Sequence, residues 1–78
     1  MLKVKYLGTF PVTLPGEIAI DGMQTLAEAM KPLIKACRMP EDFFWENHLV
    51  LLNGRRPLLE DPIADGDLLH ILSYVEGG

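Results

Sequence analysis

One amphipathic helix is the feature of this sequence that most restricts its fold. Six positions with helical spacing form one continuous apolar stripe: Leu26, Ala29, Met30, Leu33, Ile34 and Cys37. Thr25, followed three residues later by Glu28, matches a capping box that begins a helix. Pro32 falls between the stripe positions, so we expect it to bend the helix on its solvent side without breaking it.

Short strands are predicted before this helix. Leu2, Val4 and Tyr6 alternate with lysines, which is the pattern of a strand with one face in water. Residues 8–16 contain two prolines and two glycines and predict a loop. Residues 17–20 predict a second short strand, so the chain begins with a hairpin.

Further strands are predicted after the helix. Pro40 followed by two acids is typical of the start of a short helical turn. Residues 48–52 form an apolar run that indicates a central strand. The Asn53-Gly54 pair predicts a hairpin turn, followed by a short strand around residues 56–59. Residues 68–75 predict the last strand.

This order of elements predicts an α+β fold of the ubiquitin-like β-grasp type. Its mixed sheet of four to five strands would carry one main helix on one face. In a right-handed crossover the first and last strands can lie side by side at the centre of the sheet. We therefore expect one domain over residues 1–76, with Gly77-Gly78 as a flexible tail that leaves a central strand.

Charge and composition argue against several classes of protein. Acidic side chains outnumber basic ones by 11 to 7 in 78 residues, which disfavours a nucleic-acid partner or a polybasic membrane anchor. No signal peptide or membrane-spanning run is visible. The single cysteine, Cys37, cannot form an internal disulfide and is predicted to be a buried thiol. These observations favour a cytoplasmic protein.

The terminal pair Gly77-Gly78 is the main candidate functional site. Glycine lacks a Cβ atom, so such a tail can lie extended in a channel too narrow for side chains. Residues 76–78 could reach about 10 Å beyond the domain at roughly 3.3–3.6 Å per residue. A free carboxylate is unreactive towards nucleophiles, whereas an acyl-adenylate made from ATP is reactive. A carrier would need only an accessible carboxylate.

Three stretches together resemble the sulfur-carrier family. They are residues 49–54 (Leu-Val-Leu-Leu-Asn-Gly), residues 61–67 (Asp-Pro-Ile-Ala-Asp-Gly-Asp) and the final strand that runs into Gly77-Gly78. This family includes the small subunit of molybdopterin synthase and the sulfur carrier of thiamine biosynthesis, and it is related to ubiquitin. The resemblance is strongest from Leu49 onward.

The resemblance implies a carrier role and no catalytic residue in this chain. A ubiquitin-activating-type adenylyltransferase would adenylate Gly78 with ATP and magnesium, and a persulfide donor protein would then convert it to a thiocarboxylate. A downstream synthase subunit would take the sulfur, and the chain itself would bind no cofactor and no metal. The molybdopterin-type group commonly has an aromatic and two prolines shortly before the tail, whereas residues 72–76 here read Leu-Ser-Tyr-Val-Glu, and the chain is long for a thiamine carrier. The pathway therefore stays open.

A docking surface for these partners is predicted beside the tail. By strand alternation Leu69 and Ile71 face the core, while His70, Leu72 and Tyr74 face outward. This outward, largely apolar surface resembles the docking face of the family. Arg55, next to the Asn-Gly turn, is a further candidate contact.

Other candidate sites have simpler interpretations. His48 and His70 have no histidine or cysteine partners at metal-ligand spacing. Residues 43–45 (Phe-Phe-Trp) are predicted to cover the core and the sheet edge. Three aspartates do not match a calcium-binding loop and are interpreted as turn formers: Asp61, Asp65 and Asp67.

Two alternative functions remain open at this point. The chain could be a ubiquitin-like modifier that is joined through Gly78 to lysines of other proteins. It could also be a β-grasp interaction domain whose terminus is not activated, and such a domain would tolerate the loss of Gly77-Gly78.

Overall fold

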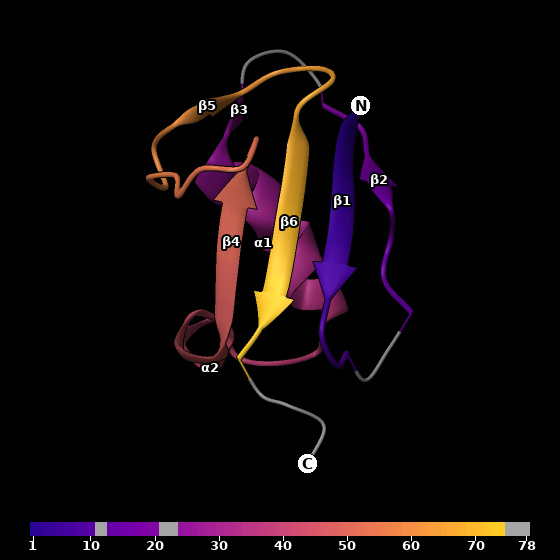
Figure 1. Cartoon of the computed structure of the whole chain (residues 1–78), viewed down its shortest axis with the longest axis vertical. Coiled ribbons are helices and arrows are strands. Elements are labelled where there is room, and N and C mark those ends of the chain that lie inside the picture. The colour runs from indigo at the N-terminus through magenta and orange to yellow at the C-terminus, as the bar shows by residue number, and fades with distance from the viewer. Residues whose placement is uncertain (11–12, 21–23, 75–78) are drawn as a thin grey trace.

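A mixed four-stranded sheet carries the main helix on one face (Figure 1). The computed structural model describes residues 1–10, 13–20 and 24–74. The elements follow in the order β1 (Leu2–Leu7), β2 (Glu17–Ile18), β3 (Gln24–Thr25), α1 (Leu26–Ala36), α2 (Glu41–Asn47), β4 (His48–Leu52), β5 (Pro62–Ile63) and β6 (Leu68–Ser73). The predicted α+β class is confirmed in these residues.

The first and last strands form the centre of the sheet. The strand order is β2-β1-β6-β4, and β1 runs parallel to β6 with a register from Lys3 opposite Leu68 to Leu7 opposite Leu72. β2 pairs with β1 and β4 pairs with β6, both antiparallel. Figure 1 shows β1 and β6 pointing the same way, with α1 behind them. The predicted N-terminal hairpin and central pair are therefore confirmed.

Two predictions about the following strands are wrong. β4 lies at an edge of the sheet and not at its centre. Residues 56–59 form no strand, and after a single bridge between Leu52 and Arg55 the next strand is β5, which pairs with β3 in a separate sheet. The turn itself forms as predicted, since Asn53 and Gly54 both have positive φ. Pro57, however, has no amide proton to continue a ladder.

The segment after this turn instead completes the start of α1. The carbonyls of Leu59 and Asp61 accept the amide protons of Ala27 and Leu26, with N···O distances of 2.9 and 2.8 Å. These amides belong to the first turn of the helix, where a helix cannot satisfy its own donors. These hydrogen bonds therefore hold the loop against the N-terminus of α1.

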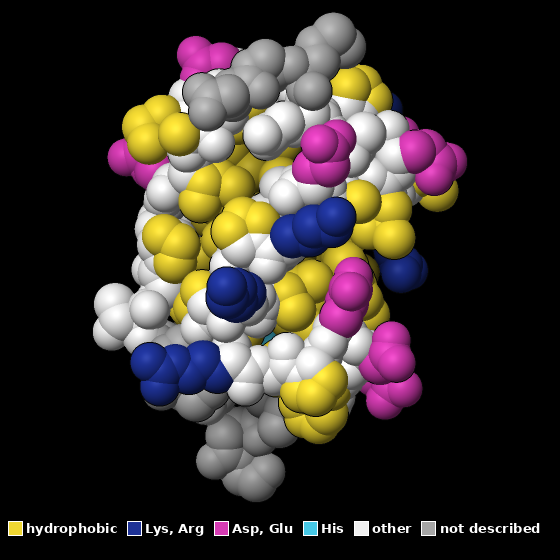
Figure 2. Space-filling view, turned by 180° about the vertical axis from the view of Figure 1, so that it is seen from behind, with side chains coloured by type: hydrophobic (Ala, Val, Ile, Leu, Met, Phe, Trp, Pro, Cys, Tyr) yellow, Lys and Arg dark blue, Asp and Glu magenta, His cyan; other side chains and the backbone are white. Residues whose placement is uncertain are grey.

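Helix α1 follows its local sequence signals. The Thr25 hydroxyl accepts the amide proton of Glu28, and the Glu28 carboxylate accepts the amide proton of Thr25, so the predicted capping box is present. Pro32 lies inside the helix at an exposed position, and the helix continues through it to Ala36, as predicted. Figure 2 shows this side of the molecule, where both basic and acidic side chains lie among exposed hydrophobic ones.

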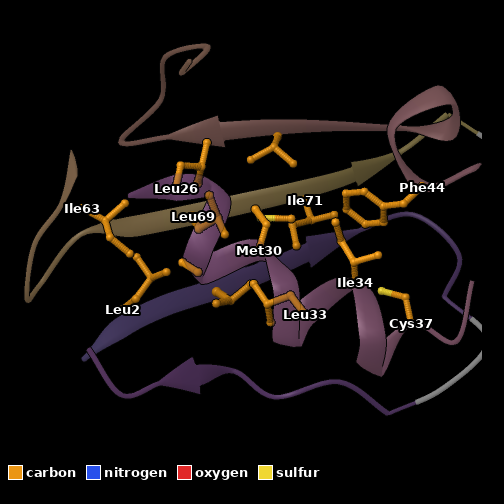
Figure 3. Packing of buried hydrophobic residues seen from close by; sticks show 13 residues of the cluster. Leu2, Leu26, Met30, Leu33, Ile34, Cys37, Phe44, Ile63, Leu69 and Ile71 are labelled. Carbon is orange, nitrogen blue, oxygen red and sulfur yellow. The ribbon is translucent and has the colours of Figure 1, made fainter. Parts of the chain in front are cut away.

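The core lies between α1 and the sheet (Figure 3). All six residues of the helical stripe are buried, including the Cys37 thiol, as predicted. They pack against Leu2 and Val4 of β1, Leu69 and Ile71 of β6, and Val50 of β4. Ile63 and Phe44 complete the cluster from β5 and α2. Of the three adjacent aromatics, Phe44 is buried and Trp45 is partly buried, whereas Phe43 is exposed.

Tyr6 anchors the loop between β1 and β2. Its hydroxyl donates a hydrogen bond to the carbonyl of Pro15 at 2.7 Å, and its ring meets the edge of Phe10 at 5.3 Å between centroids. Burial, with a smaller contribution from the charge of a Cys37 thiolate, raises the pKa of Tyr6 from 10.0 to about 12. Burial also raises the pKa of Cys37 above its usual value. Both groups are therefore held in their neutral forms.

We predict that the protein loses stability at alkaline pH through Tyr6. Between about pH 10 and pH 12 tyrosine ionises in the unfolded chain but stays protonated in the fold, so the free energy of unfolding falls as pH rises. Urea unfolding of the wild type and Tyr6→Phe across this range measures the effect. Tyr6→Phe should show the smaller decrease, and Tyr74→Phe, which alters an exposed tyrosine, should match the wild type. Equal decreases in all three proteins would contradict the assignment.

Candidate functional site

The sheet face opposite α1 is the candidate functional surface. Along β6, Leu69 and Ile71 are fully buried towards the helix, while His70 and Leu72 point to the other face and are partly exposed. In Figure 1 this face is turned to the viewer, and no helix of the described residues crosses it. The predicted division of β6 into core-facing and outward-facing residues is confirmed.

Strand register assembles neighbouring side chains around these outward residues. Leu72 lies between Leu7 of β1 and Leu49 of β4. His70 lies in the next row, between the exposed Lys5 of β1 and Leu51 of β4. We call the resulting surface the open-face patch, and its members are Leu7, Leu49, Leu51, His70, Leu72 and Tyr74. Leu7 is 51% exposed and Tyr74 is 58% exposed, so the patch presents large apolar groups to solvent.

The end of β6 is fixed on both sides. The amide of Tyr74 donates to the carbonyl of Asn47 at 2.8 Å, which extends the pairing with β4 by one residue. On the β1 side Gly8 adopts a φ of +107°, and a Cβ atom added there would lie 2.9 Å from the Cβ of Ser73. Glycine at this position therefore lets the two chains approach closely. These contacts hold the backbone of Ser73 and Tyr74 on both sides.

The predicted activation site lies outside the described residues. Tyr74 is the last residue described, and Gly77 and Gly78, with the predicted boundary of the tail at residue 76, fall in the segment that follows it.

Arg55 is separated from the rest of the predicted docking surface. The register places His48 opposite Ser73 and Leu52 opposite Leu69, so Tyr74 and Arg55 follow opposite ends of the β4–β6 ladder. Arg55 lines a cavity of about 550 Å³ beside the Asn-Gly turn. The structure thus brings His70, Leu72 and Tyr74 onto one face and leaves Arg55 away from Tyr74.

Sequence reasoning did not identify three members of the patch. Leu7, Leu49 and Leu51 lie beside the predicted residues because of the strand register. The alternation in β1 and β4 could have predicted that these leucines face outward, since each of them alternates with core-facing residues of its own strand. The alternation does not show which strands are neighbours, however, so it cannot predict that these leucines form one continuous surface with β6.

Two of the three predicted turn-forming aspartates bond to backbone amides of turns. The Asp67 carboxylate accepts the amide protons of Ala64 and the Asn53 side chain, and Asp61 accepts the amide proton of Leu58. These two aspartates are turn formers, as predicted. Over residues 1–10, 13–20 and 24–74, no group of three or more His, Cys, Asp or Glu side chains could hold a metal ion. No helix in the described part of the chain is long and apolar enough to cross a membrane.

Comparisons with protein-family models, with curated proteins and with solved structures give no match.

We predict unequal costs for two leucine truncations in β6. Leu69→Ala should lower the free energy of unfolding by about 2–5 kcal/mol, because it leaves a cavity under α1. Leu72→Ala, on the open face, should lower it by less than about 1 kcal/mol. Urea unfolding of the two variants measures the difference. An equal loss for Leu72→Ala would show that the open face is covered in solution.

Proposed function

We propose that this chain is a ubiquitin-like β-grasp sulfur carrier of cytoplasmic cofactor biosynthesis, of the molybdopterin or thiamine type. The observation that carries the proposal is the position of β6, the strand that leads to Gly77-Gly78. It is an inner strand, paired with β1 on one side and β4 on the other. The strand that precedes the diglycine end is therefore held on both sides by the rest of the domain.

The open-face patch supports the same proposal. A carrier has to be recognised by its activating enzyme through a surface that leaves the terminal carboxylate free. The patch includes Leu72 and Tyr74, which directly precede the terminal segment. Apolar side chains that are exposed on a rigid sheet can contribute to affinity without the cost of ordering the backbone. An enzyme bound to this patch would be close to the carboxylate that it activates.

The proposed chemistry takes place on partner enzymes. The Gly78 carboxylate attacks the α-phosphorus of magnesium-bound ATP, which releases pyrophosphate and leaves an acyl-adenylate. The terminal sulfur of a donor persulfide then attacks the acyl carbon, and AMP leaves. A thiol of the partner then attacks the inner sulfur of the former persulfide, which forms a disulfide on the partner and releases the thiocarboxylate. A synthase subunit finally accepts this sulfur, and the carrier returns with a carboxylate.

We expect a mass change that corresponds to one oxygen-to-sulfur exchange. The full chain is incubated with a ubiquitin-activating-type adenylyltransferase from the same organism, magnesium, ATP and a persulfide donor, and its intact mass is measured. Deletion of Gly77-Gly78 should abolish the change. Leu72→Asp should slow adenylation by about tenfold or more, which corresponds to the loss of roughly 1.4 kcal/mol of binding. Lys31→Asp, on the exposed face of α1, is the matched control and should react normally.

Other outcomes would favour the alternative functions. An unchanged mass with an enzyme that activates another carrier in the same assay would refute the proposal. Isopeptide-linked products with lysines of other proteins would identify a modifier. Full biological function after deletion of Gly77-Gly78 would identify an interaction domain whose terminus is not activated.

A further inference from the structure

The outer edge of β4 carries unpaired backbone groups. The bonds from Tyr74 to Asn47 and from Asn53 to Leu68 show that odd-numbered residues of this segment pair with β6. The backbone groups of His48, Val50 and Leu52 therefore point away from the sheet. Leu52 exchanges two hydrogen bonds with Arg55, at 2.8 and 3.1 Å. Both backbone groups of Val50 and the carbonyl of His48 have no partner among the described residues.

The edge of β4 has little protection against pairing with another chain. Edge strands commonly carry a lysine, a proline or a bulge, or are covered by a loop, and here the loop bonds to the outward backbone groups of Leu52 alone. β4 reads His-Leu-Val-Leu-Leu and is regularly paired along its whole length. An apolar, regular edge of this kind is suited to accept a further strand.

A cavity lies along this edge. Its volume is about 270 Å³, and its walls include Leu26, Trp45, Val50, Pro57 and Leu59. The wall formed by the loop is held in place, because the Leu59 carbonyl is bonded to α1 and the Leu58 amide to Asp61. Leu58 and Leu59 are nevertheless 62% and 47% exposed. An apolar side chain of an added strand would find a preformed site here.

Arg56 gives this edge a charge preference. It lines the edge cavity, whose described walls hold no carboxylate, whereas the neighbouring 550 Å³ cavity is lined by Arg55 and Arg56 together with Asp61 and Asp67. Neither arginine side chain has an ion pair or hydrogen bond in the described residues, although the chain is acidic overall. A free guanidinium is well suited to bind a carboxylate. The edge therefore matches a strand that carries an acidic side chain.

We infer that the β4 edge is a second docking site, which binds an extended, acidic segment of a partner protein as an added strand. The backbone of that segment pairs with Val50, one apolar side chain enters the 270 Å³ cavity, and a carboxylate meets Arg56. This site is independent of the terminal carboxylate and so does not rest on the proposed carrier function.

A second copy of the chain fits this edge less well. Antiparallel pairing of two β4 strands about Val50 would place His48 opposite Leu52 of the other copy. The outward groups of Leu52 are already bonded to Arg55, so such a pair would gain few hydrogen bonds. A partner with free backbone groups along its whole length avoids this cost.

The test uses the full chain and synthetic peptides of alternating valine and glutamate, blocked at both ends. Nuclear magnetic resonance of the ¹⁵N-labelled protein should show shifts at residues 48–50 and 55–59 and slower hydrogen exchange of the Val50 amide. The same peptide with lysine in place of glutamate should bind about tenfold more weakly. Arg56→Glu should reverse that preference. Lys31→Glu, which makes the same charge change on α1, should leave it unaltered.

A peptide methylated at alternate backbone amides separates strand addition from simple charge attraction. It should not protect Val50, since it cannot pair with the edge. Equal binding of this peptide would overturn the proposal, as would shifts confined to the open-face patch or no shifts at millimolar peptide. Protection of Val50 that rises with protein concentration in the absence of peptide would identify a second copy as the occupant and would also overturn it.

Discussion

The parallel pairing of β1 with β6 is the interaction on which the rest of this structure depends. It joins the first and last strands through five register pairs, from Lys3–Leu68 to Leu7–Leu72. Parallel strands require a crossover, and α1 within that crossover covers one face of the pair. The same pairing aligns Leu7 with Leu72 on the opposite face, which α1 leaves uncovered. One long-range contact therefore determines both the hydrophobic core and the open-face patch.

The Asn-Gly turn links this central pair to the helix. Asn53 adopts a positive φ, its side-chain oxygen accepts the amide proton of Leu68, and its amide group donates to Asp67. These bonds hold the end of β4 to the start of β6. The loop that follows supplies the carbonyls of Leu59 and Asp61 to the first turn of α1. Because these carbonyls are bonded to the helix, the loop does not add a strand to the sheet. The outward backbone groups of Val50 in β4 are therefore left unpaired.

Local signals in the sequence were sufficient for α1 and for the alternation in β1 and β6. The capping box and the apolar stripe act within a few residues, and the burial of Leu69 and Ile71 follows from strand period. The strand predicted at residues 56–59 was wrong, because those residues are recruited by the distant helix N-terminus. β4 was misplaced at the centre because its five-residue apolar run does not distinguish a strand between two others from an edge strand with one buried face. Leu7 and Leu49 were missed because register is a property of the assembled sheet.

The two proposed docking surfaces are not independent of each other in space. Leu49 and Tyr74 belong to the open-face patch and also line the cavity at the β4 edge. A strand added to that edge would lie against the same residues that an activating enzyme would contact through Leu72. A carrier that is loaded by one protein and unloaded by another needs its partners to exchange. Because both partners would contact Leu49 and Tyr74, a partner at the edge would compete with one on the open face.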